Sequence, residues 1–202
     1  MSWWHTITFL GDSAFTVPGA CMVALWLGLN GWWRQMLRWL LAFGVAMMIV
    51  VITKLLFMGW NITPPLLYNF TGISGHTASA TALYLTLAVL LTEGRSAQAR
   101  GLALTLACAL LLSVGLSRFM IKVHSASEVV TGLMVGAAAA WWFCRGLAPE
   151  RKSLRASLVL VAAAAFMLTG TAGQPAPTQA LLKQIAQSLS GRDQVYSRTI
   201  PL

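Results

Sequence analysis

Six apolar segments, separated by short polar loops, constrain the fold of this chain more than any other feature of its sequence. They cover residues 14–29, 39–57, 76–92, 101–116, 128–143 and 156–171. A helix needs about 20 apolar residues to cross a bilayer, with a range of about 17–25. Charged residues make up 9% of the 202 residues, whereas a soluble globular protein has about 25%. The sequence therefore predicts an all-α fold: a polytopic membrane protein whose six-transmembrane-helix bundle occupies residues 1–172.

The tail, residues 173–202, differs in composition from the segments before it. A run rich in Gly and Pro at residues 173–177 interrupts any helix. Thr178 can begin a short helix, and Gly191 can end it. One face of that helix would be apolar, with Leu181, Leu182, Ile185 and Leu189. Two interpretations stay open: an amphipathic helix on the outer membrane surface, and a solvated extracytoplasmic tail.

The net charge of +9 is explained by the loops between the apolar segments. Eight of the 14 basic residues lie in loops that would share one side of the membrane: Arg34, Arg38, Arg95, Arg100, Arg145, Arg151, Lys152 and Arg155. Because basic residues are enriched in cytoplasmic loops, both termini and the opposite loops are predicted to lie outside the cytoplasm. The basic residues do not cluster with interleaved aromatic residues, so nucleic-acid binding is not expected.

The loop after the fourth apolar segment concentrates polar groups suited to phosphate chemistry. Arg118, Lys122, His124 and Glu128 occur within eleven residues. His124 and Glu128 are four residues apart, so on a helix they share a face and can touch. A carboxylate on one imidazole nitrogen fixes the tautomer and leaves the other nitrogen as a nucleophile or base. The guanidinium of Arg118 matches phosphate oxygens. The alternative is a structural ion pair in an ordinary short loop.

A second polar motif, Ser74-Gly75-His76, precedes the third apolar segment. Two glycines, Gly72 and Gly75, before an Ala-rich run predict a tight turn into a helix. The N–H groups of a helix N-terminus favour anions, and a histidine there can protonate a departing oxygen. The alternative is a polar helix start with an interfacial histidine. Both motifs fall on one predicted face of the membrane, which favours a common function.

Together the two motifs resemble the type-2 phosphatidic acid phosphatase superfamily of membrane lipid phosphatases. The pattern of that family is Lys-x6-Arg-Pro, then Pro-Ser-Gly-His, then Ser-Arg-x5-His-x3-Asp. Ser74-Gly75-His76 matches the second block, and Ser117, Arg118 and His124 match the third block at the family's spacing. The resemblance covers the chain from Lys54 to Glu128.

The resemblance implies a role for each matching residue. His124 would attack phosphorus and form a phosphohistidine, Glu128 would orient His124, and His76 would protonate the leaving group. The phosphate-binding residues would be Arg118, Lys54, Ser74 and Gly75. No metal and no other cofactor is implied, since positive side chains and helix amides would stabilise the charge.

Three parts of the family pattern are not matched, and one of them is the Pro before Ser74, where this chain has Ile73. Asn61-Ile62 stands where Arg-Pro is expected after Lys54, so a phosphate-binding arginine is missing, and Glu128 replaces Asp. Lys122 is hypothesised to supply the lost positive charge, with a lipid headgroup contact as the alternative. Asp12 is expected either to cap a helix or to pair with a cation of the site.

These observations predict an integral membrane lipid phosphatase that hydrolyses a lipid phosphate or polyprenyl diphosphate through a phosphohistidine. The resemblance to compact bacterial members implies the bacterial inner membrane, with the site in the periplasm. One alternative is a lipid-linked phosphotransferase with the same intermediate. Another is a non-catalytic binding or assembly protein on a decayed phosphatase scaffold, which the missing arginine favours. A transporter is disfavoured because ionisable residues near mid-span are scarce.

Overall fold

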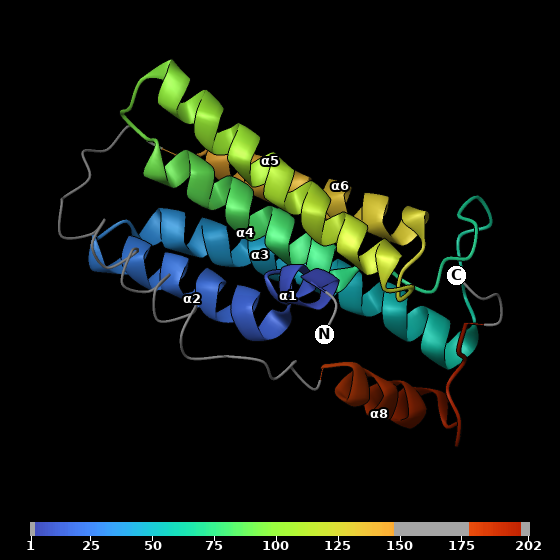
Figure 1. Ribbon diagram of the computed structural model, residues 1–202. Helices are drawn as coiled ribbons and strands as arrows, with labels where there is room; N and C mark the ends of the chain where they lie inside the picture. Colours follow the sequence, from blue (N-terminus) through green and yellow to red (C-terminus); the bar gives the residue numbers. More distant parts are fainter. Residues whose placement is uncertain (1–2, 148–177, 199–202) are drawn as a thin grey trace.

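The computed structural model describes residues 3–147 and 178–198, and within these ranges the chain forms helices and no strand. The helices are α1 (Trp3–Phe9), α2 (Ser13–Leu29), α3 (Trp33–Trp60), α4 (Gly75–Leu91), α5 (Ala97–Met120), α6 (Ala126–Cys144) and α8 (Thr178–Ser190) (Figure 1). The predicted all-α fold is confirmed for this part of the chain. The sixth predicted apolar segment, 156–171, lies outside the described residues.

The first five apolar segments each lie within or nearly within one helix, and α3, α5 and α6 extend beyond their apolar runs at both ends. In the described ranges, four helical stretches are long and apolar enough to cross a membrane: Trp3–Leu29, Trp33–Trp60, Ala97–Met120 and Ala126–Cys144. α4 is apolar but shorter. The short helix α1 was not predicted. The protein thus has the helices of a membrane protein.

Helix α4 lies at the centre of the bundle and packs against α2, α3, α5 and α6. Most of its side chains are buried, and among its large apolar residues only the last, Leu91, is exposed. In contrast, α3 exposes a long apolar surface that includes Leu37, Leu41, Val45, Met48, Ile52 and Leu56. This difference explains the compositions of the two helices, because α4 contacts protein where α3 can contact lipid.

Two glycines of α6 allow it to approach α4 closely. A Cβ atom at Gly132 would lie 2.8 Å from the carbonyl oxygen of Ser74, and one at Gly136 would lie 2.6 Å from Cβ of Thr81. Small residues permit this close packing of helices in membranes. The α4–α6 contact fixes the start of α4, where the Ser74-Gly75-His76 motif lies, next to the start of α6.

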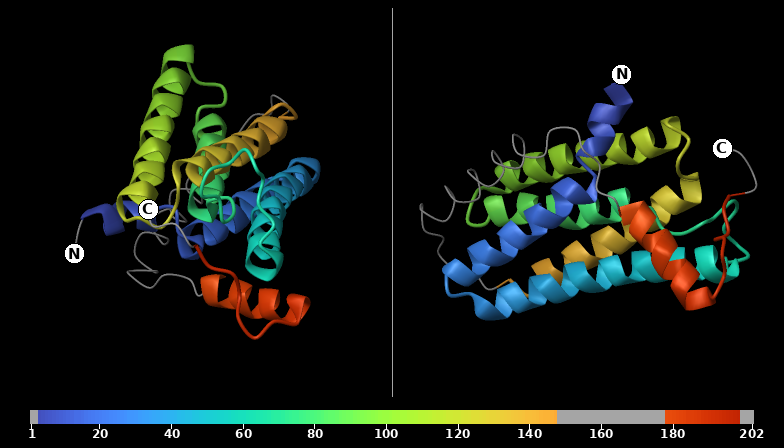
Figure 2. Two further views of the ribbon diagram at one scale, coloured as in Figure 1. Left: turned by 90° about the vertical axis from the view of Figure 1, so that its right-hand side faces the viewer. Right: turned by 90° about the horizontal axis from the view of Figure 1, so that it is seen from below.

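Successive long helices alternate in direction, so the two polar motifs lie at the same end of the bundle (Figures 1 and 2). Helix α8 packs against the end of α3, where Ala186 contacts Phe57 and Met58. The backbone N–H of Tyr196 donates to the carbonyl oxygen of Met58 at 2.9 Å. The tail is therefore attached to the end of the bundle that holds the motifs.

Candidate active site

Glu128 is completely buried at the start of α6 and faces His124. Ser125 caps α6 in a capping box: its side chain accepts from the N–H of Glu128, and Glu128 Oε2 accepts from the N–H of Ser125 at 3.0 Å. This reciprocal capping turns the carboxylate back toward the preceding loop. Oε2 of Glu128 lies 2.7 Å from Nδ1 of His124.

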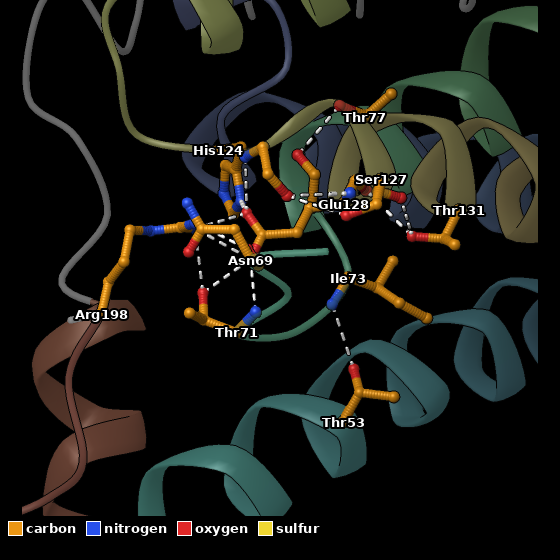
Figure 3. A network of polar contacts seen from close by, with 12 residues as sticks. Thr53, Asn69, Thr71, Ile73, Thr77, His124, Ser127, Glu128, Thr131 and Arg198 are labelled. Atoms are coloured by element: carbon orange, nitrogen blue, oxygen red, sulfur yellow. Dashed lines mark hydrogen bonds and ion pairs between the residues drawn. The ribbon is translucent and has the colours of Figure 1, made fainter. Parts of the chain in front are cut away.

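The other partners of Glu128 come from distant parts of the sequence (Figure 3). Oε1 accepts hydrogen bonds from the backbone N–H of Thr71 at 2.6 Å and from its hydroxyl at 2.7 Å. Nη2 of Arg198 lies 2.9 Å from Oε1 and 2.8 Å from Oε2. Three segments of the chain, the turn before α6, the loop with Thr71 and the tail, thus hold one buried carboxylate in a fixed orientation.

His124 is buried in the turn between α5 and α6 and is 8% exposed. Burial lowers the pKa of His124 to about 4, although its hydrogen bond with Glu128 acts in the opposite direction. The imidazole is therefore neutral at neutral pH. Because the N–H at Nδ1 donates a hydrogen bond to the carboxylate of Glu128, the free lone pair of the ring is on Nε2. This is the form of histidine that can act as a nucleophile.

His76 lies in the first turn of α4 and has a carboxylate partner of its own. Its Nε2 is 3.2 Å from Oδ2 of Asp12. Asp12 also caps α2, since its Oδ1 accepts from the N–H of Ala14 at 2.8 Å. The two interpretations of Asp12 that the sequence left open therefore hold together: it caps a helix and pairs with a histidine of the site.

A cavity of about 1600 Å³ brings the polar motifs together. Its wall includes Lys54 of α3, His76 of α4, Arg118 of α5 and His124. Apolar side chains such as Val50, Val51, Phe57, Met58 and Leu182 form another part of the wall. The cavity therefore combines positive and histidine side chains with an apolar surface. Within the described ranges, no group of three or more His, Cys, Asp or Glu side chains could hold a metal ion.

The loop before α4 is fixed to both α3 and α6. Gly72 has φ +129°, and a Cβ atom there would lie 2.7 Å from Cγ of Lys54 and 3.0 Å from its Cα. The N–H of Ile73 donates to Oγ1 of Thr53 at 3.2 Å, and the N–H of Ser74 donates to the carbonyl oxygen of Glu128 at 3.1 Å. Glycine is required at position 72 because the loop backbone runs directly over α3.

Not every residue that the sequence singled out lines the cavity. Gly75 does, but the buried hydroxyl of Ser74 pairs with that of Thr77 at 2.9 Å. Lys122 is exposed in a turn with φ +55° and is not part of the cavity wall. Asn61, at the position of the expected arginine, ends α3 with φ +56° and is exposed. The structure thus does not bring Lys122 together with the other predicted site residues.

Sequence reasoning gave no role to two residues that contact Glu128. Thr71 belongs to the loop that was assigned as a turn, but its hydrogen bonds to the carboxylate depend on the fold. Arg198 lies 70 residues beyond Glu128, after the Gly191 that is predicted to end the helix of the tail. No local signal in the sequence distinguishes it from the other basic residues of the tail.

Comparison with known proteins agrees with this geometry. A family model described as the PAP2 superfamily matches residues 59–152, which include both polar motifs and begin after Lys54. The chain is 35% identical over 201 residues to a Klebsiella pneumoniae protein named "Uncharacterized 22.5 kDa protein in cps region", and the match covers 97% of this chain and 96% of the relative. No solved structure matches the chain. This chain, with its paired histidine motifs at one end of an apolar helical bundle, belongs to the PAP2 superfamily, the type-2 phosphatidic acid phosphatases.

Proposed function

We propose that this protein is an integral membrane phosphatase that hydrolyses a lipid phosphate or a polyprenyl diphosphate through a phosphohistidine. The observation that supports this most strongly is the cavity itself. Lys54, Arg118, His76 and His124 come from separate elements and line one space, and the buried carboxylate of Glu128 orients His124. An apolar wall beside cationic groups suits a substrate with a charged headgroup and a hydrocarbon chain.

In the first step, Nε2 of His124 attacks phosphorus. The new N–P bond forms as the P–O bond to the leaving group breaks, and His76 gives its proton to the departing oxygen. Glu128 stabilises the positive charge that develops on the His124 ring. Arg118 and Lys54 bind the phosphate oxygens, and the amides at the start of α4, near Gly75, add to this stabilisation.

In the second step, water attacks the phosphohistidine. His76, now neutral, takes a proton from the water as the oxygen bonds to phosphorus. The N–P bond breaks, inorganic phosphate leaves, and both histidines return to their starting states. Each step uses only the residues named for it and water.

The proposed orientation in the membrane follows from the basic residues at the end of the bundle opposite the cavity. Arg34, Arg38, Arg95, Arg100 and Arg145 lie at or near helix ends opposite the cavity. With these residues in the cytoplasm, the cavity opens on the periplasmic side of a bacterial inner membrane. Residues 1–172 would form a six-span domain, and 173–202 an extracytoplasmic tail. Labelling of a single cysteine at Asn69, but not at Ser96, by an impermeant reagent tests this orientation.

A phosphotransferase is the second candidate, because the cavity of about 1600 Å³ exceeds the roughly 300–1000 Å³ of a typical ligand site. An acceptor hydroxyl could therefore lie beside the phosphohistidine and replace water in the second step. The atoms balance in the same way, with the acceptor oxygen forming the new P–O bond and His76 taking its proton.

The test uses purified protein in detergent with a panel of lipid phosphates and diphosphates. Released phosphate supports hydrolysis, and a phosphorylated product that appears only with an added alcohol or sugar supports transfer. His124→Ala should abolish turnover and the trapped phosphoenzyme. Glu128→Gln should impair both, whereas the matched change Glu93→Gln, in the loop after α4, should not. Acid-labile phosphate on His76, or wild-type turnover by His124→Ala, would refute the assignment.

A further inference from the structure

The described part of the tail ends at Arg198, and its guanidinium reaches the buried carboxylate of Glu128 (Figure 3). Nη2 contacts both oxygens of Glu128, at 2.9 and 2.8 Å, and the hydroxyl of Thr71 at 3.1 Å. Nη1 donates to the carbonyl oxygen of Asn69 at 2.7 Å. These contacts join the tail to the two loops that hold the polar motifs.

Glu128 needs a cation because its carboxylate is completely buried. An ionised group in such a place is stable only if it is paired and hydrogen-bonded. In the described part of the chain, the ion-pair partners of Glu128 are His124 and Arg198. Since His124 must be neutral to attack phosphorus, the permanent positive charge beside Glu128 comes from Arg198.

Contacts between the tail and α3 hold the guanidinium of Arg198 in a fixed place. Ala186 of α8 is buried against Phe57 and Met58, and the N–H of Tyr196 bonds to Met58. Arg198 follows Tyr196 by two residues. Its side chain is 18% exposed. A group held in this way loses little conformational entropy when it binds, which favours a permanent contact.

We propose that the C-terminal tail completes the active site, with Arg198 as a positioning residue that holds Glu128 against His124. This inference rests on the proposed function, because it gives Arg198 a task in a phosphohistidine reaction. Arg198 is on the carboxylate side of the dyad, whereas the phosphoryl group would form on Nε2 of His124, at the opposite edge of the ring. Arg198 also lines the cavity, but its guanidinium is bonded to Glu128, Thr71 and Asn69. Arg198 therefore acts on the nucleophile through Glu128 and is not assigned as the missing phosphate-binding arginine.

The experiment compares Arg198→Ala and Arg198→Lys with Arg192→Ala in the full-length protein. Arg192 is the matched control, since it lies in the same tail and stacks on Tyr196 at 4.6 Å from the ring centroid. A hydrogen bond to a charged group is worth about 1.5–3 kcal/mol, so Arg198→Ala should lower kcat by roughly ten- to a hundredfold. KM should change less than about twofold, because a positioning residue does not bind substrate. Added guanidinium should restore part of the activity of Arg198→Ala, and Arg192→Ala should resemble the wild type.

A double-mutant cycle with Glu128→Gln gives a readout that does not need activity. Arg198→Ala should lower the Tm in the wild-type background and much less in the Glu128→Gln background, since the neutral amide does not require the cation. Equal losses in both backgrounds, or a raised KM with unchanged kcat, would overturn the inference; the second result would make Arg198 a phosphate ligand. If the wild type releases no phosphate from any substrate, the proposed function fails, and the Tm cycle still decides whether the tail holds Glu128.

Discussion

Nε2 of His76 lies 3.2 Å from Oδ2 of Asp12, so the histidine assigned as the acid is paired with the carboxylate that caps α2. A carboxylate at this distance stabilises the protonated imidazole. We expect Asp12→Asn to weaken the stabilisation of protonated His76 without disturbing the cap of α2. Asparagine is as good a helix cap as aspartate, so α2 should still begin at the same place while His76 loses its charged partner.

The expected result of Asp12→Asn is a loss of kcat/KM that depends on the leaving group. A charged hydrogen bond of about 1.5–3 kcal/mol corresponds to a roughly ten- to a hundredfold loss for a lipid phosphate, whose alkoxide must be protonated. The loss should be much smaller for an aryl phosphate with an acidic phenol. Steady-state kinetics with the two substrates check this. Equal losses on both would show that Asp12 acts on something other than the proton transfer.

The second prediction concerns the protonation of His124. Since burial lowers its pKa to about 4, the neutral form should persist through pH 5–7, and the ring should be protonated only as the pH falls through the lowered pKa. Imidazole NMR of the detergent-solubilised protein, with the His124 signal assigned by its loss in His124→Ala, measures this directly. A midpoint at or above the ordinary value of about 6.5 would contradict the prediction.

The amino-acid sequence was sufficient to predict the helical fold and the pairing of His124 with Glu128. Both depend on local patterns: apolar run length in one case and a four-residue spacing in the other. The sequence indicated a site cation as one partner for Asp12 without identifying His76, and it gave no sign that Arg198 contacts Glu128, because each contact joins residues at least 64 positions apart. Helix packing, which brings α2 against α4 and α8 against α3, creates these contacts, and no spacing rule contains them.

The position of Lys122 could not be inferred from its neighbours in the sequence. Its place between Arg118 and His124 in the sequence suggested the site face, but the chain turns there with φ +55° and leaves the side chain exposed. A residue in a turn can point away from neighbours that lie on either side of it. Proximity in sequence therefore does not establish proximity to the substrate.

The third prediction compares the loss of Lys122, which is exposed, with the loss of Arg118, which lines the cavity. Lys122→Ala should lower kcat/KM much less than Arg118→Ala, because Arg118 lines the cavity and Lys122 does not. Loss of the Arg118 guanidinium should cost roughly tenfold or more, with an increase in KM, since it would bind the phosphate of the substrate. Assays at two salt concentrations separate headgroup attraction from direct binding, because salt screens exposed charges most. If the two variants lose activity equally, Lys122 moves into the site when substrate binds.

The last prediction concerns Gly72, where the loop before α4 crosses α3. Its φ of +129° is disfavoured for a residue with a side chain, and a Cβ atom would overlap the backbone and Cγ of Lys54. The conformation costs of order 1–3 kcal/mol, and relief of the overlap would move Lys54 and the loop apart. Gly72→Ala should therefore lower both Tm and kcat.

Gly94→Ala is the matched control for this change. Gly94 also has a positive φ, +71°, but no atom lies within 4 Å of its Cβ position, and it lies in the loop between α4 and α5. That variant should lose some thermal stability and keep its kcat. The comparison separates the cost of the backbone conformation from the collision with Lys54, with thermal unfolding in detergent and phosphate release as the two measurements. A Gly72→Ala protein that matches Gly94→Ala in both would mean that the loop is not held against α3 at Lys54, and the position of His76 would then need another explanation.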